Sequence, residues 1–76
     1  MITVYSRPDC MPCKFTKQFL TEHNIPFENV DVSEEPEELE LLKQHGFFAL
    51  PVVAENKSFD FAFCGFQPDK LNDLLK

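Results

Sequence analysis

The sequence lacks tryptophan and has only two glycines and one tyrosine among its 76 residues. It contains no run of about 18 apolar residues, so we expect no transmembrane helix. Basic residues are also scarce, since seven Lys and Arg stand against thirteen Asp and Glu, which gives a net charge of −6. Binding to a nucleic-acid backbone or to an anionic membrane needs clustered cations, so the composition argues against both as partners.

Cysteine is rare too, with three residues. A small secreted domain stapled by disulfides usually has an even number of at least four. The first residues also show neither a basic n-region nor an apolar h-region, so no secretory signal peptide is expected. We therefore expect a reducing cytoplasm, in which one cysteine pair cycles chemically.

What the sequence does have is a regular alternation of strand and helix patterns, in a chain short enough to be a single domain, 1–76. Apolar periodicity and turn residues predict four strands and three helices. The expected strands are 2–6, 26–32, 51–54 and 58–63, and the expected helices are 12–23, 33–45 and 68–76. This order, βαβ followed by αββα, predicts an α/β domain with a four-stranded mixed sheet, helices on both faces and the minimal thioredoxin fold.

The same periodicity predicts which side chains form the core. In the last strand Phe59, Phe61 and Phe63 alternate, so we expect them on one face of the sheet. The helical positions expected to face inward are Phe15, Phe19 and Leu20, then Leu39 and Leu42, and finally Leu71, Leu74 and Leu75. Three phenylalanines in predicted loops, Phe47, Phe48 and Phe66, are better suited to an apolar contact surface.

Cys10 and Cys13 form a C-x-x-C pair at the predicted turn between the first strand and the first helix. Such a pair near a βαβ pattern is typical of a thioredoxin-like redox motif. Unpaired N–H groups at the helix N-terminus stabilise a thiolate, so Cys10 is the expected nucleophile. Cys13, one turn deeper, is expected to be more buried and to act as the resolving thiol.

The residues around the pair tune this chemistry. Arg7 and Lys14 add positive potential on either side of the motif. Met11 and Pro12 carry no charge, Pro12 stiffens the turn, and Met11 offers a soft apolar contact to a protein substrate.

Alternatively, the pair could supply two of the four ligands of a structural zinc site. The other candidate ligands, Cys64, His23 and His45, lack the spacing that such a site requires. We therefore expect no metal. Cys64 is either a regulatory thiol or a small packing residue, and free cysteines are among the most buried residue types, which favours packing.

Three segments make the chain resemble the NrdH-redoxins, glutaredoxin-like proteins of the thioredoxin superfamily. They are Cys10-Met11-Pro12-Cys13, Leu50-Pro51-Val52-Val53 and Phe63-Cys64-Gly65-Phe66-Gln67-Pro68-Asp69-Lys70. The last is similar to a W-S-G-F-R-P-D-like segment of that family, with Phe63, Cys64 and Gln67 as departures. The resemblance covers essentially the whole chain.

The resemblance implies a protein disulfide reductant that donates electrons to the large subunit of class Ib ribonucleotide reductase. It implies recycling by NADPH-dependent thioredoxin reductase. We expect a monomer with no bound cofactor, whose redox group is the Cys10–Cys13 disulfide. The residues expected to contact a substrate or partner are Arg7, Met11, Pro12, Leu50, Pro51, Val52, Phe63, Gly65 and Phe66.

For the peptide bond before Pro51, the residue pattern and the family resemblance lead to different expectations. The residue pattern alone favours a trans bond, because only about 5–6% of X-Pro bonds are cis. The resemblance implies that this bond is cis.

Two other functions remain open at this point. A glutaredoxin would use glutathione, and Arg7 could hold one of its carboxylates, although the bulky Phe66 and the missing N–H of Pro68 weaken the second contact. A non-catalytic module would use the fold, or a metal on the cysteine pair, for binding alone.

Overall fold

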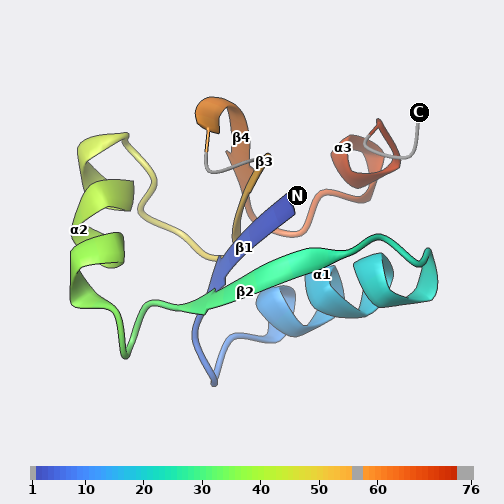
Figure 1. The fold of residues 1–76 in the computed structure, drawn as a ribbon, viewed down its shortest axis with the longest axis horizontal. Helices are drawn as coiled ribbons and strands as arrows, with labels where there is room; N and C mark the ends of the chain where they lie inside the picture. Colours follow the sequence, from blue (N-terminus) through green and yellow to red (C-terminus); the bar gives the residue numbers. More distant parts are fainter. Residues whose placement is uncertain (1, 56–57, 74–76) are drawn as a thin grey trace.

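Seven elements follow one another in the order that the sequence predicts (Figure 1). The computed structural model describes residues 2–55 and 58–73, with the backbone alone at positions 58, 60 and 61. The elements are β1 (Ile2–Ser6), α1 (Met11–Glu22), β2 (Phe27–Asp31), α2 (Pro36–Gln44), β3 (Val52–Glu55), β4 (Ser58–Cys64) and α3 (Pro68–Asp73). The expected core positions Leu74 and Leu75 lie outside the described residues.

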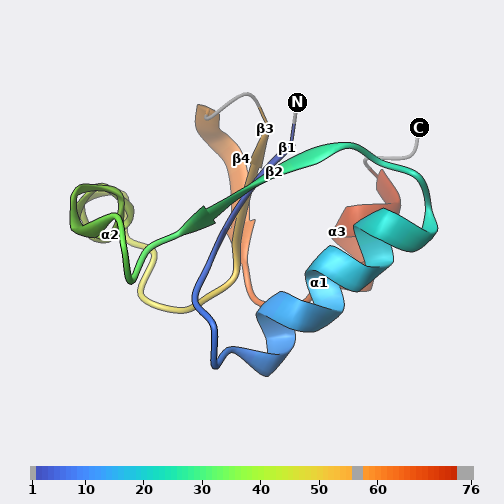
Figure 2. The same cartoon turned by 60° about the horizontal axis from the view of Figure 1, so that its bottom comes forward.

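The strands form one mixed sheet in the order β2-β1-β3-β4. β1 runs parallel to β2 and antiparallel to β3, and β3 and β4 form the predicted antiparallel hairpin. α1 and α3 cover one face of the sheet and α2 covers the other (Figure 2). The predicted α/β class, a four-stranded mixed sheet with three helices, is confirmed. No helix in the described part of the chain combines the length and apolar content needed to span a membrane.

The start of α2 differs most from the prediction, because the helix begins at Pro36 and not at residue 33. The Asp31 side chain accepts hydrogen bonds from the backbone N–H and the hydroxyl of Ser33, at 2.9 and 2.6 Å. Such bonds hold a turn in place of a helix. A residue that precedes a proline is disfavoured in the helical conformation. Glu35 is such a residue, so the helix starts at the next residue, Pro36.

Both faces of the sheet are buried, by alternate residues of the same strands. Val4 and Val53 pack with Leu20 of α1 and Leu71 of α3 on one face. Tyr5, Val52 and Ala54 pack with Leu42 of α2 on the other face. The continuous burial of β1 from Ile2 to Ser6 follows from this two-sided packing.

The prediction that Phe59 and Phe63 share a face of β4 is wrong. Phe63 packs on the α1 and α3 side, whereas Phe59 packs on the α2 side against Tyr5. The pairing of β3 with β4 changes from Val53–Phe63 to Glu55–Ser58, an irregularity that places extra residues in β4. Because side chains alternate with a period of two, an odd register shift moves later residues to the opposite face. The Phe61 side chain lies outside the described part.

Phe15 also departs from the prediction, since 45% of its surface is exposed. The buried stripe of α1 consists of Cys13, Thr16 and Leu20. A residue directly before Thr16 lies about 100° around the helix from the centre of this stripe, so it faces away from the sheet. Phe15 instead contacts the Phe66 ring, with 6.0 Å between the ring centroids.

Leu71 is the residue whose truncation we expect to release α3 from the sheet. It is fully buried among the side chains on the α1 side. Leu71→Ala should lower the free energy of unfolding by about 2–5 kcal/mol, because it removes buried methyl groups and leaves a cavity. Urea unfolding of the oxidised protein measures this. The exposed neighbour Asn72→Ala is the control and should stay within about 0.5 kcal/mol of the parent, and equal losses for both variants would contradict the packing role of Leu71.

Candidate redox-active site

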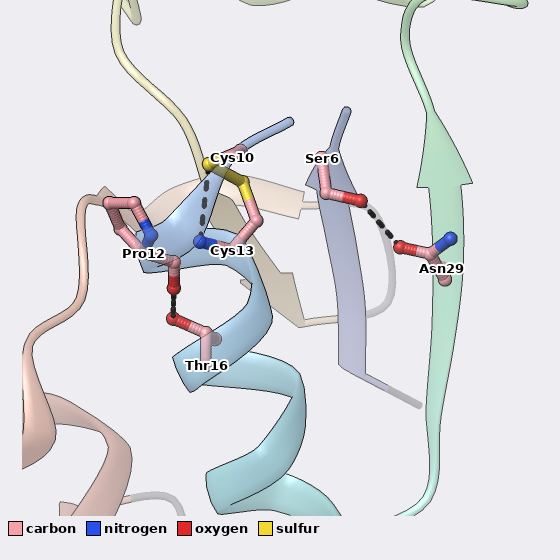
Figure 3. The surroundings of a disulfide bond; sticks show 6 residues. All are labelled: Ser6, Cys10, Pro12, Cys13, Thr16 and Asn29. Atoms are coloured by element: carbon pink, nitrogen blue, oxygen red, sulfur yellow. Dashed lines mark hydrogen bonds between the residues drawn. A yellow bond between two sulfur atoms is a disulfide. The ribbon is translucent and has the colours of Figure 1, made fainter. Parts of the chain in front are cut away.

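Cys10 and Cys13 are joined by a disulfide bond at the N-terminus of α1, with 5.2 Å between their Cα atoms (Figure 3). β1 ends at Ser6, and the Cys10 N–H donates to the Arg7 carbonyl at 3.3 Å to close a turn. The extended Cys10 is the N-cap residue of α1, so the helix begins at Met11. The local sequence places both sulfurs at the first turn of one helix.

Burial separates the two cysteines. Cys10 is half-buried, whereas Cys13 is completely buried among the residues of α1 that face the sheet. A sulfur of another molecule can therefore reach Cys10 but not Cys13. The prediction that Cys13 is the more buried of the two is confirmed, and the roles of attacking and resolving thiol stay a prediction.

The Cys10 sulfur occupies the acceptor position of a helix cap. The Cys13 backbone N–H donates to Cys10 Sγ at 3.1 Å (Figure 3). When the pair is reduced, the same N–H and the helix dipole favour a thiolate at this position. The first turn of α1 contains no acidic residue and carries the exposed Lys14, so nothing in that turn opposes the negative charge.

Thr16 is a site residue that the sequence reasoning missed. It is fully buried, and its Oγ1 donates to the Pro12 carbonyl at 3.0 Å, which fastens the turn that holds both sulfurs (Figure 3). A threonine on the buried stripe of a helix, four residues after a proline in its first turn, was the available signal.

A second hydrogen bond supports the strands beneath the site. The buried Ser6 hydroxyl, at the end of β1, donates to Asn29 Oδ1 of β2 at 2.6 Å (Figure 3). It fixes the end of the strand from which the chain turns toward Cys10.

The Leu50–Pro51 peptide bond is cis, as the resemblance implied and against the expectation from the residue pattern alone. The Pro51 carbonyl accepts a hydrogen bond from the Gly65 N–H at 2.8 Å. Gly65 has φ +84°, a conformation that favours glycine. The turn after β4 is therefore held beside the loop that precedes β3.

The predicted contact residues fall into two groups. Pro51, Val52 and Phe63 are buried, so their side chains belong to the core and do not form a contact surface. The exposed or half-buried members of the set are Arg7, Met11, Pro12, Leu50, Gly65 and Phe66. Of these, Arg7 and Leu50 line a groove of about 310 Å³ together with Cys10.

Cys64 is half-buried and carries a free thiol. It pairs with Val52 in the sheet and packs at the edge of the cluster on the α2 side. Its carbonyl accepts a hydrogen bond from Gln67 Nε2 at 2.6 Å. Within the described residues, no three His, Cys, Asp or Glu side chains gather as a set of metal ligands.

Comparisons with known proteins agree on one family. The family model described as Glutaredoxin matches residues 2–59. The chain is 45% identical over 74 residues to a glutaredoxin-like protein NrdH of Lactococcus lactis, covering 97% of this chain and 99% of that protein. It is 40% identical over 73 residues to the Escherichia coli protein of the same name, covering 96% and 86%.

A solved structure agrees with these sequence matches. The chain is similar to the NrdH-redoxin of Escherichia coli, which is described as a glutaredoxin-like protein with a thioredoxin-like activity profile. The TM-score is 0.88 at 40% identity, and the match covers 96% of this chain and 92% of the other.

Cys64→Ser tests whether the third thiol takes part in the chemistry. The side chain is half-buried at the edge of a cluster, and serine has nearly the same size. We expect the rate of disulfide reduction to stay within about twofold of the parent, the effect typical of a substitution away from the reacting atoms. An insulin reduction assay measures the rate, and a large loss would give Cys64 a chemical role.

Proposed function

The chain belongs to the glutaredoxin family as a thiol–disulfide oxidoreductase similar to the NrdH glutaredoxin-like proteins, and on that premise we propose that it donates electrons to a class Ib ribonucleotide reductase. We further propose that NADPH-dependent thioredoxin reductase recycles it in the cytoplasm, and that it works as a monomer without a bound cofactor. The observation that carries the proposal is the disulfide at the start of α1 between the half-buried residue Cys10 and the fully buried Cys13.

The thiol–disulfide exchange proceeds in two steps, through a mixed disulfide between Cys10 and the substrate. The Cys10 thiolate attacks one sulfur of the substrate disulfide, the substrate S–S bond breaks, and the departing thiolate takes up a proton. The Cys13 thiolate then attacks Cys10 Sγ, forms the internal disulfide and releases the second substrate thiolate, which also takes up a proton. Two electrons and two protons pass to the substrate, and the product is the Cys10–Cys13 disulfide present in this structure.

The helix N-terminus favours the first step. A lowered thiol pKa raises the fraction of Cys10 that is thiolate, which is the attacking species. In the disulfide form the Cys13 N–H donates to the Cys10 sulfur at 3.1 Å, and the same N–H is available to a thiolate at that position. Burial keeps Cys13 from reacting with other molecules and leaves the mixed disulfide as its target.

The turn after β4 supports thioredoxin reductase over glutathione as the source of electrons. A glutathione carboxylate needs donor groups at the start of a helix, and α3 begins with Pro68, which has no N–H. The Gln67 amide already donates to the Cys64 carbonyl. The Phe66 ring contacts Phe15 and occupies part of this surface.

Replacing each cysteine in turn tests the assignment of roles. Cys10→Ser should abolish disulfide reduction, because a hydroxyl does not attack a disulfide at neutral pH. Cys13→Ser should accumulate a mixed disulfide with the substrate, since the resolving thiol is missing. Mass spectrometry of the non-reduced protein measures the adduct, with Cys64→Ser as the matched control, and full turnover by the Cys13 variant would contradict the roles.

The source of electrons is tested by following NADPH oxidation with insulin as the disulfide substrate. We expect turnover with thioredoxin reductase alone and little with glutathione plus glutathione reductase, because Pro68 offers no N–H at the start of α3 and the Phe66 ring occupies part of this surface. Turnover only in the presence of glutathione would overturn this part of the proposal, and the protein would then act as a glutathione-dependent glutaredoxin.

A further inference from the structure

The groove beside Cys10 combines an apolar wall with two cations. Its apolar lining includes Leu39 of α2, Leu50 from the loop before β3, and Phe48, whose side chain is 80% exposed. Arg7 and Lys43 line the same groove, and both are exposed. So large an exposed aromatic surface beside a reactive group is typical of a contact site.

Positive charge at this place contrasts with the rest of the protein, whose net charge is −6. The acidic side chains of α2 line two other hollows, Glu38 in one, and Glu37 and Glu40 in the other. Leu39 and Lys43, one helical turn apart, instead line the groove at Cys10. α2 therefore separates its charges, with the cation on the side of the reactive sulfur.

Within the described residues, the two cations differ in whether they interact with a carboxylate of the same chain. The pKa of Asp31 lies below its ordinary value, chiefly because the Ser33 hydroxyl and N–H donate to it, with smaller contributions from Lys17 and Arg7. Arg7 thus also faces a carboxylate of its own chain. Lys43, in the last turn of α2, is the better residue for a test.

We propose that this groove selects protein disulfides by the segment next to the reacting cysteine, which carries a carboxylate side chain beside an apolar one. Lys43 binds the carboxylate, Arg7 adds positive potential beside it, and Leu39, Phe48 and Leu50 contact the apolar side chain. The inference rests on the proposed function and names the substrate class of the same site. When the first substrate sulfur bonds to Cys10, the residues beside it come to lie next to a side chain that lines this groove.

The test uses reduced protein mixed with an excess of a short peptide that contains one disulfide, so that no reductase is needed. Two peptides differ only beside the cysteine, with Phe-Glu in one and Phe-Gln in the other. Quenching with an alkylating agent and mass spectrometry gives the rate of protein oxidation at each peptide concentration. The limiting rate then reports chemistry, and the half-saturating concentration reports binding.

For the parent protein, we expect the Glu peptide to half-saturate at a concentration about two- to fivefold lower than the Gln peptide, the range of an exposed ion pair. The limiting rates should agree, and the difference should shrink at about 1 M salt. Lys43→Gln should remove the preference and Lys43→Arg should keep it. Lys70→Gln is the matched control, because Lys70 lies on α3 over the Phe63 ring, on the opposite face of the sheet.

Equal half-saturation by both peptides with the parent protein would overturn the inference, as would a preference that survives in Lys43→Gln. Glutathione disulfide also carries carboxylates and serves as a third substrate. If it bound as tightly as the Glu peptide and depended equally on Lys43, the groove would be a glutathione site and the inference would fail. Failure of all peptides to oxidise the protein would instead contradict the proposed function.

Discussion

The hydrogen bond from the Cys13 N–H to the Cys10 sulfur is the interaction on which the site depends. It makes a sulfur the cap of α1, so the helix that carries the resolving cysteine also stabilises the attacking one. The bond requires α1 to start at one place and to stay there. Leu20 and Thr16 secure this, the first by packing under the sheet and the second by binding the Pro12 carbonyl.

The two faces of the sheet have different roles at the site. Its α1 and α3 face buries Cys13 and fixes the direction from which Cys10 is approached. Its α2 face carries the groove through which a substrate segment would pass, with Lys43 and Leu39 on one helix. The hydrogen bond between the Pro51 carbonyl and the Gly65 N–H joins the loops that border both faces. Cys10 is the N-cap residue of α1 and also lines the groove at α2. The sulfur that attacks the substrate disulfide therefore belongs to a residue of the groove that contacts the substrate.

The negative and positive side chains of this acidic protein lie in different places. Seven of the thirteen acidic residues line two hollows formed by β2, α2 and the segment between them, and Cys10 lines neither hollow. The cations nearest the motif favour both the thiolate and an acidic substrate segment. Because exposed ion pairs are weak and screened by salt, they tune the choice of substrate and leave the chemistry to the sulfurs.

The order of the elements, the α/β class and the cysteine pair could be read from the sequence, because they depend on local periodicity and on spacing within one turn of helix. The burial of Leu71 belongs to the same local class. The positions of Phe59 and Phe15 did not follow, because a register shift between β3 and β4 sets the first and the choice of which face of α1 packs on the sheet sets the second. The meeting of Arg7, Cys10 and Lys43 at one groove was likewise decided only by the tertiary structure, since it depends on how α2 packs against the sheet and no local pattern encodes that distance.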